Sequence, residues 1–175
     1  VKGASEEIVG LCTSYEEQGD VARIPLDKAA REQIHAVHVN LEKEGFRVLG
    51  IAWREVPADH PHAVIGDEAE LVFAGFAAFL DPPKASAGSA LAALKERGIS
   101  VKIVTGDSEL VTQHVCGQLN IPVLGVLTGK DIATLDDAAL RVMVEKTNLF
   151  CRVNPAQKER VILALKARGH VVGYL

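Results

Sequence analysis

Residues 99–107 read Ile99-Ser100-Val101-Lys102-Ile103-Val104-Thr105-Gly106-Asp107, and this stretch indicates the fold class more strongly than any other. Its first six residues are rich in β-branched side chains and predict a strand. Apolar residues at helical spacing follow Asp107, so the loop Thr105–Asp107 joins this strand to a helix. Ligands of open α/β sheets bind at the carboxyl ends of strands, and a helix N-terminus favours anions. We therefore predict a phosphate site at Thr105, Gly106 and Asp107.

The sequence around this stretch alternates between helical and strand patterns. Helices of about a dozen residues that alternate with short, β-branched strands are typical of a parallel sheet. The predicted order is helix 86–97, strand 99–104, helix 109–119, strand 123–127, helix 137–146, strand 148–153, helix 155–168 and strand 171–175. The later part of the chain is therefore predicted to be an α/β domain.

The earlier part of the chain has a different pattern. A helix that begins at Ser5 and carries apolar residues as far as Tyr15 is predicted to end at Gln18-Gly19-Asp20. A second helix over 27–44 is followed by strands over 46–53 and 70–79. Prolines lack an amide donor and fix their own φ, so Asp81-Pro82-Pro83 predicts a stiff joint. We place a domain boundary there and predict domains over residues 1–78 and 79–175.

Composition limits the classes of function. Hydrophobic residues make up 48% of the 175 residues, which is enough for a packed core, and the formal net charge is −4. That charge argues against nucleic acid or anionic lipid as the main partner, because both require clustered Lys and Arg. No apolar run approaches the roughly 18–20 residues that cross a bilayer. The chain begins at Val1 rather than Met, and we expect it to be part of a longer protein.

Cysteine and histidine residues do not indicate a metal centre. Cys12, Cys116 and Cys151 are odd in number, far apart and without a CxxC pair, so we expect small buried thiols in a reducing cytosol. Two histidine pairs, His35/His38 and His60/His62, lack a third ligand at suitable spacing. We expect them to lie on a helix surface and in a loop.

Lys158 is the second residue that indicates anion chemistry. It follows the N-cap Asn154 and the first-turn Pro155 of a helix, three residues before the apolar Val161. One reading is a lysine stem that lies along the core with its ammonium in water. The other is a cation held over an anion, which phosphoryl transfer requires. Thr-Gly-Asp alone is a weak signal, and Lys158 strengthens it.

Three further positions carry candidate binding groups. Arg152 follows a strand and is either a solvated charge or part of the same electropositive site. Arg47 lies within a strand on the face of Leu49, where a cation indicates an ion pair or a ligand phosphate. Lys2-Gly3 offers a glycine that lets a ligand approach the backbone.

In order along the chain, these motifs resemble the cytoplasmic part of P-type ATPases, pumps that form an aspartyl phosphate while they move cations. The resemblance covers essentially the whole chain, and Asp81-Pro82-Pro83-Lys84 looks most like the magnesium-translocating branch. The motifs are Lys2-Gly3-Ala4, Gly45-Phe46-Arg47-Val48-Leu49, Asp81-Pro82-Pro83-Lys84, Thr105-Gly106-Asp107, Leu127-Thr128-Gly129-Lys130-Asp131-Ile132, Phe150-Cys151-Arg152-Val153-Asn154-Pro155-Ala156-Gln157-Lys158 and the closing Gly169-His170-Val171-Val172-Gly173-Tyr174-Leu175.

The resemblance implies a fold and partners. Residues 1–78 would be the C-terminal part of an α+β nucleotide-binding domain. Residues 79–175 would be a segment of a Rossmann-like, haloacid-dehalogenase-type phosphorylation domain with a parallel sheet. ATP and Mg²⁺ would serve the full-length pump at the cytoplasmic face of a membrane. The partners would be the transmembrane helices and actuator domain of that pump.

The resemblance also implies roles for single residues, which we state as expectations. Four positions would belong to the nucleotide: Lys2 and Gly3 near adenine, Arg47 at the ATP phosphates, and Asp81 at the hinge between the domains. Arg152 would help to bring ATP to the phosphorylation site. The remaining expected site residues are Thr105 and Gly106, which would hold the transferring phosphoryl group, Asp107 close to the nucleotide, and Lys158 against the aspartyl phosphate.

Two family motifs do not occur in the sequence. These are the Asp-Lys-Thr-Gly-Thr segment with its nucleophilic aspartate and the Gly-Asp-Gly-x-Asn-Asp loop that holds magnesium, which is expected after Leu175. An adenine-stacking aromatic residue is missing too. We therefore expect no ATP hydrolysis by this chain alone.

Two alternatives to a pump segment stay open. The first is a haloacid-dehalogenase-like phosphatase, whose only acidic strand-end candidate, Asp81, precedes two prolines instead of forming Asp-x-Asp. The second is a silent nucleotide-binding regulatory module.

Overall fold

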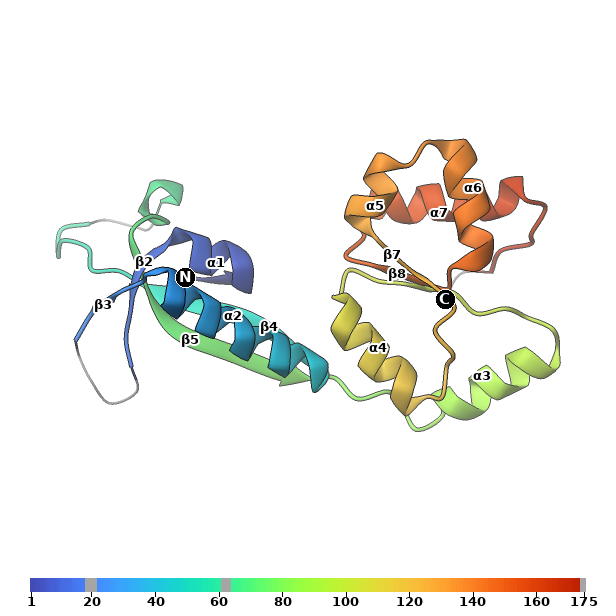
Figure 1. The fold of residues 1–175 in the computed structure, drawn as a ribbon, viewed down its shortest axis with the longest axis horizontal. Helices are drawn as coiled ribbons and strands as arrows, with labels where there is room; N and C mark the ends of the chain where they lie inside the picture. Colours follow the sequence, from blue (N-terminus) through green and yellow to red (C-terminus); the bar gives the residue numbers. More distant parts are fainter. Residues whose placement is uncertain (18–21, 61–63, 174–175) are drawn as a thin grey trace. The chain divides into compact units, whose positions relative to one another are not determined.

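The computed structural model describes residues 1–17, 22–60 and 64–173, and it divides the chain into two compact units (Figure 1). Unit 1 is Val1–Asp81 and unit 2 is Pro82–Leu175. Each unit has its own sheet and is described by itself below.

Unit 1 is built on a five-stranded mixed sheet with the order β1-β4-β5-β2-β3. Only the β2–β5 pair is parallel among the described residues. The strands are β1 (Lys2–Ala4), β2 (Cys12–Tyr15), β3 (Ile24–Pro25), β4 (Phe46–Trp53) and β5 (Leu71–Leu80), and the helical elements are α1 (Ser5–Leu11), α2 (Lys28–Lys43) and the 3₁₀ turn η1 (Ile65–Asp67).

One face of this sheet carries the core of unit 1. Alternate residues of a strand point to opposite faces, but a bulge between Ile51 and Ala52 shifts the β4–β5 register, so that Phe73 and Phe76 both join the core side. Phe73 packs in the cluster formed by residues of α1, α2 and the strands, and Phe76 stacks on His38 of α2 at 5.7 Å between ring centroids. The predicted surface position of His38 is therefore wrong, since its exposed fraction is 7%.

The first predicted helix was too long. It ends at Leu11, and Cys12–Tyr15 form β2 instead of a further helical turn. The physical reason is tertiary pairing, because Cys12 and Tyr15 lie opposite Leu71 and Phe73 of β5 and bury apolar surface there. The predicted stop at Gln18-Gly19-Asp20 lies outside the described residues.

Unit 2 is built on a three-stranded, all-parallel sheet with the order β6-β8-β7. Helices alternate with these strands along the chain, which confirms the predicted α/β class. The elements are α3 (Ala87–Glu96), β6 (Ile103–Val104), α4 (Glu109–Gln118), β7 (Val126–Thr128), α5 (Gly129–Thr134), α6 (Asp137–Lys146), β8 (Leu149–Cys151) and α7 (Pro155–Ala167).

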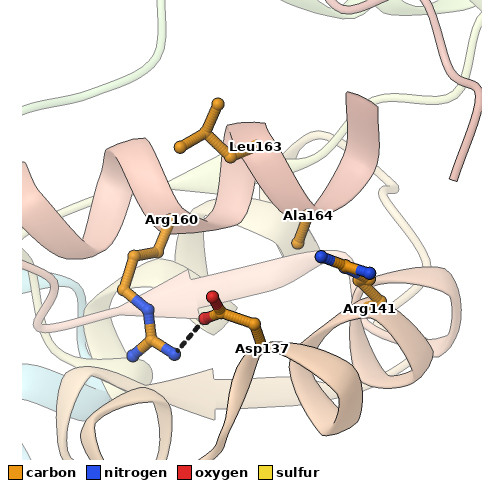
Figure 2. Close-up of a pocket in the computed structure, with 5 residues that line it drawn as sticks. All are labelled: Asp137, Arg141, Arg160, Leu163 and Ala164. Carbon is orange, nitrogen blue, oxygen red and sulfur yellow. Dashed lines mark hydrogen bonds and ion pairs between the residues drawn. The ribbon is translucent and has the colours of Figure 1, made fainter. Parts of the chain in front are cut away.

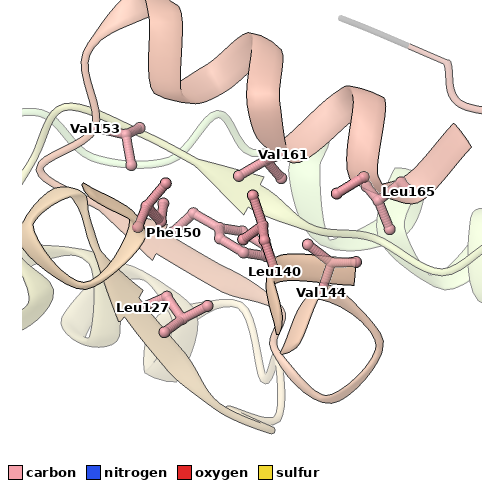
Figure 3. Close-up of a cluster of buried hydrophobic side chains, with 9 residues drawn as sticks. Leu127, Leu140, Val144, Phe150, Val153, Val161 and Leu165 are labelled. Carbon is pink, nitrogen blue, oxygen red and sulfur yellow. The ribbon is translucent and has the colours of Figure 1, made fainter. Parts of the chain in front are cut away.

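The central strand β8 supplies side chains to both faces of this sheet. Phe150 is fully buried in a cluster under α5, α6 and α7, where it meets residues such as Leu140, Val161 and Leu165 (Figure 3). Its neighbours Leu149 and Cys151 point the other way and pack with Cys116 of α4. All three cysteines of the chain are free and buried, as predicted from their spacing.

The predicted strands of unit 2 are shorter, shifted or absent. The strand predicted over 123–127 is β7 at Val126–Thr128, and the one predicted over 148–153 is β8 at Leu149–Cys151. In the 99–104 stretch only Ile103 and Val104 form a ladder, because the partner strand β8 begins at Leu149 and the chain before it is helical as far as Lys146. Lys102 serves a different purpose, since its Nζ donates to the carbonyls of Val144 (2.5 Å) and Thr147 (2.7 Å) at the end of α6. Burial lowers the pKa of Lys102 there. Of the predicted strand over 171–175, residues 171–173 are irregular and residues 174–175 lie outside the described part.

None of the helices in residues 1–17, 22–60 and 64–173 combines the length and the apolar character that a membrane span requires.

We predict that Gly129→Ala destabilises unit 2 by about 1–3 kcal/mol, the usual cost of overpacking. A Cβ at this position would overlap with the Arg152 carbonyl oxygen and lie 2.7 Å from Gln157 Oε1. Urea unfolding, followed by the amide NMR signals of β8, measures the effect. The matched control is Gly117→Ala in α4, where a Cβ meets nothing within 4 Å. This control should be stabilised by about 0.5–1 kcal/mol. Equal stability of the two variants would contradict the prediction.

Candidate functional site

The candidate site of unit 2 lies at the carboxyl ends of β6 and β8, which are neighbouring parallel strands. Thr105–Asp107 follow β6 and Arg152 follows β8. Hydrogen bonds between the two loops extend the ladder past the strands: Thr105 N donates to Phe150 O (2.8 Å), Val153 N to Thr105 O (3.1 Å) and Arg152 N to Asp107 O (2.9 Å). The structure therefore brings Thr105, Asp107 and Arg152 together, as strand-end positions in a parallel sheet predict.

Thr105 and Asp107 form a closed local turn. The Thr105 hydroxyl donates to Asp107 Oδ2 (2.9 Å) and accepts from the Asp107 amide (3.1 Å). Gly106, at the tip, is exposed, and a Cβ there would lie 3.9 Å from the Val153 carbonyl. The tip of this turn is accessible to a ligand.

Lys158 lies in the first turns of α7, which begins at the same edge of the sheet. Asn154 caps this helix by accepting from Gln157 N (2.9 Å). The Lys158 side chain is half-buried, and no hydrogen bond or ion pair of its ammonium occurs with the residues described in the structure. This placement is compatible with either predicted role, the stem along the core or the cation above an anion.

The turn that begins α5 packs against the Arg152 loop. Gln157 Nε2 donates to the Gly129 carbonyl (2.7 Å), and Gln157 Oε1 accepts from Asn154 N (3.0 Å). Gln157 thereby joins the starts of α5 and α7. The sequence analysis did not single out Gln157, although the spacing Asn-x-x-Gln before an apolar run is the signature of a capping box.

Glu109 is the other group at this edge that the sequence analysis missed. It is the first residue of α4, and its Oε2 accepts from Arg152 Nε at 3.2 Å. The two residues lie 43 positions apart in the chain. No local sequence signal could have identified this pair.

Buried thiols adjoin the site but are not reactive candidates. Burial raises the pKa of Cys151, which precedes Arg152, and burial likewise raises the pKa of Cys116 in α4. A thiolate is the nucleophilic form of cysteine, so a raised pKa suppresses it.

A second group of predicted residues lies in unit 1. Lys2 pairs with Ile51 across the β1–β4 ladder, and Arg47 precedes Ile51 by four residues on β4, so both side chains point to the same face. This face also carries Leu49 and Phe79, of which Phe79 is 54% exposed and lies opposite Arg47. It is the face opposite to the one that packs on α1.

Gly3 lies on the other face. It pairs with Gly50, and a Cβ on Gly3 would lie 3.4 Å from Ile8 Cδ1. The space at Gly50 is smaller still, because a Cβ added there would lie 2.9 Å from the Ile8 Cβ. The structure therefore gives Gly3 a packing role under α1, and its nucleotide role stays a prediction.

Asp81 ends unit 1 beside Arg47. Its Oδ2 lies 3.5 Å from Arg47 Nη1, and the two side chains are 69% and 52% exposed. The predicted hinge residue and the predicted phosphate-binding arginine are thus an exposed ion pair.

A separate small pocket between α6 and α7 is lined by Asp137, Arg141, Arg160, Leu163 and Ala164 (Figure 2). Arg160 donates to the carbonyls of Ile132 and Leu135 (both 2.9 Å) and pairs with Asp137 (2.8 Å). Arg160 therefore fixes the end of α5. None of the predicted site residues lines this pocket.

The metal-ligating side chains of the described residues are not gathered into a binding site. No cluster of three or more His, Cys, Asp or Glu side chains that could hold a metal ion occurs in the described ranges. The Thr105–Asp107 turn itself offers one carboxylate, Asp107, which Thr105 already engages.

Asp131, in the capping box of α5, is expected to make the stability of the fold depend on pH. Asp131 Oδ2 accepts from the Thr128 hydroxyl (2.7 Å) and the Thr128 amide (2.8 Å), and these bonds hold the pKa of Asp131 below its ordinary 3.8. A lowered folded-state pKa stabilises the fold above the unfolded value, and this contribution is lost as pH falls through the folded pKa. A carbon-detected NMR titration should show the low pKa in the native chain. Thr128→Val should raise it toward the ordinary value, and an unchanged pKa in that variant would contradict the assignment.

Comparison with known proteins gives consistent matches. Residues 1–86 match the family described as "P-type ATPase, cytoplasmic domain N". The chain is 42% identical over 174 residues to "Magnesium-transporting ATPase, P-type 1" of Salmonella typhimurium, which covers 99% of this chain and 19% of that protein. The protein of the same name from Escherichia coli K12 is 41% identical over 174 residues, with the same coverage.

A more distant relative has a broader name. "Probable cation-transporting ATPase F" of Mycobacterium tuberculosis H37Rv is 37% identical over 180 residues, covering 98% of this chain and 19% of that protein. The chain spans about a fifth of the length of the curated relatives it matches.

Proposed function

We propose that this chain, which belongs to the P-type ATPase family, is the segment of a magnesium-transporting pump that binds ATP and supports aspartyl-phosphate formation. One observation carries the proposal: the main chain ties the Thr105–Asp107 turn to the Arg152 loop at one edge of a parallel sheet. The names of the relatives support magnesium as the transported ion. The parent protein would lie in a membrane, with this segment on its cytoplasmic side and joined to its transmembrane helices and actuator domain.

Unit 2 would be part of a haloacid-dehalogenase-type phosphorylation domain. In that domain, the Thr105 hydroxyl and the Gly106 amide would hold the transferring phosphoryl group at the tip of the turn. Lys158 would neutralise the charge on its oxygens, and Arg152 would contact the nucleotide phosphates. Cations and donors fixed before the reaction stabilise a phosphoryl group without further reorganisation. Asp107 would lie near the nucleotide with its carboxylate oriented by Thr105.

Unit 1 would be the C-terminal part of a nucleotide-binding domain. The face of Lys2 and Arg47 combines two cations with apolar side chains such as Leu49, which suits a base at one end and phosphates at the other. Lys2 would lie near adenine on this face, Gly3 would meet adenine through its backbone, and Arg47 would contact phosphate. ATP and Mg²⁺ would be used by the full-length pump.

A phosphatase is less well supported. Its nucleophile would have to be Asp81, which follows β5 of the mixed sheet and pairs with Arg47. The Thr105 turn belongs to the other, all-parallel sheet. The alternative of a silent regulatory module predicts the same binding and is distinguished by the sequence on either side of this segment.

The Lys158 role is tested with inorganic phosphate. In an NMR titration of the ¹⁵N-labelled chain, phosphate should shift the amides of Thr105 and Gly106. Lys158→Ala should weaken binding about tenfold, as expected for loss of a charged hydrogen bond. The matched control Lys166→Ala, on the same helix, should bind phosphate like the native chain.

The same chain should release no phosphate from ATP above the buffer rate. Release that Lys158→Ala abolishes would contradict the proposed inactivity of the isolated segment. Equal phosphate affinity in Lys158→Ala and Lys166→Ala would contradict the proposed role of Lys158.

The role of the unit 1 face is tested with ATP. Arg47→Gln should weaken ATP binding about three- to tenfold, because a phosphate contact is lost. Calorimetry or amide shifts of β4 measure this. Lys28→Gln removes the same charge from α2 and should leave the affinity unchanged. Indistinguishable affinities of these two variants would exclude Arg47 from the nucleotide site.

A further inference from the structure

Glu109 places a carboxylate where the proposed site should receive an anion. Its Oε2 accepts from Arg152 Nε (3.2 Å), and the side chains of Glu109 and Arg152 are 31% and 43% exposed. Glu109 also lies in the first turn of α4, directly after the N-cap Ser108. A helix N-terminus attracts negative charge. The Glu109 carboxylate therefore lies beside two groups that would attract a phosphate, the Arg152 guanidinium and the N-terminus of α4.

Main-chain hydrogen bonds hold the backbone of Arg152 at this edge. Arg152 adopts φ = 50°, in the left-handed region that non-glycine residues rarely occupy. Its amide donates to the Asp107 carbonyl (2.9 Å), and Val153 N donates to Thr105 O (3.1 Å). The backbone of Arg152 is thus placed at this edge by main-chain bonds.

We propose that Glu109 is a built-in competitor for the phosphate groups that Arg152 binds. The inference rests on the proposed function and adds the regulation of that site. In the absence of ligand, Arg152 is engaged by Glu109. An arriving phosphate displaces the carboxylate, and the displaced charge then repels the ligand. Glu109 lowers the affinity of the site without contacting the ligand.

The same arrangement recurs in unit 1. Arg47, the other arginine proposed to contact phosphate, lies 3.5 Å from the Asp81 carboxylate. The two pairs belong to different sheets and different chain segments. Each proposed phosphate-binding arginine therefore rests against a carboxylate that an anion must replace.

The test measures the affinity of the native chain and of Glu109→Gln for inorganic phosphate. The Gly106 amide chemical shift is followed in a phosphate titration at low ionic strength. Glutamine keeps the shape and removes the charge. We expect phosphate to bind Glu109→Gln about two- to fivefold more tightly, the range that corresponds to one exposed ion pair. The difference should shrink at about 0.5 M salt, because salt screens exposed charges. Glu96→Gln in α3 changes the net charge equally and should bind like the native chain.

The outcomes separate this inference from the proposed function. Unchanged or weaker binding by Glu109→Gln, with normal binding by the native chain, overturns the inference alone. Weaker binding would show that Glu109 positions Arg152. A gain in Glu96→Gln equal to that in Glu109→Gln also overturns the inference, since net charge would then explain it. Absence of binding by both the native chain and Glu109→Gln contradicts the proposed phosphate site and the inference together.

Discussion

The arrangement of the candidate site in unit 2 depends on hydrogen bonds that extend the β6–β8 ladder beyond its strands. The strands are short, with two and three residues, and the ladder continues through Thr105 N to Phe150 O and Val153 N to Thr105 O. The last bond, from Arg152 N to Asp107 O, requires Arg152 to adopt a positive φ. Because these are main-chain bonds, the separation of the two loops does not depend on which side chains they carry.

A second contact restricts the same edge from the other side. The Arg152 carbonyl lies so close to Gly129 that any side chain there would overlap with it. Gln157 then joins the Gly129 carbonyl to the Asn154 amide. The starts of α5 and α7 are therefore fixed against one loop, and Lys158 directly follows Gln157 in the helix that these bonds hold.

The sequence predicted most of the elements because their signals are local. The helix over 137–146, and the helix that begins at Pro155, have caps and apolar spacing that the fold preserves. The errors arise where the neighbouring strand, and not the local sequence, determines whether a segment is extended. Cys12–Tyr15 form a strand because β5 lies beside them. Ile99–Val101 do not, because the partner strand β8 begins at Leu149, opposite Ile103.

The same distinction holds for the site. Thr105, Asp107 and Arg152 could be placed at one edge because the carboxyl ends of parallel strands meet there. Glu109 could not be paired with Arg152, because this contact depends on how α4 packs, and no spacing rule encodes it. Which face of the sheet Lys2 takes and which Gly3 takes also could not be predicted without the register of β1 with β4.

The charges at the unit 2 edge have a consequence for the isolated segment. Two carboxylates, Asp107 and Glu109, lie at the same edge of the sheet as the cations Arg152 and Lys158. Counting cations would therefore overestimate the attraction for a phosphate, because Glu109 already compensates Arg152. A multiply charged ligand still gains over a single carboxylate, since it offers more oxygens to the same guanidinium. The affinity of such a site for phosphate therefore depends on the ion pair that the arginine must give up.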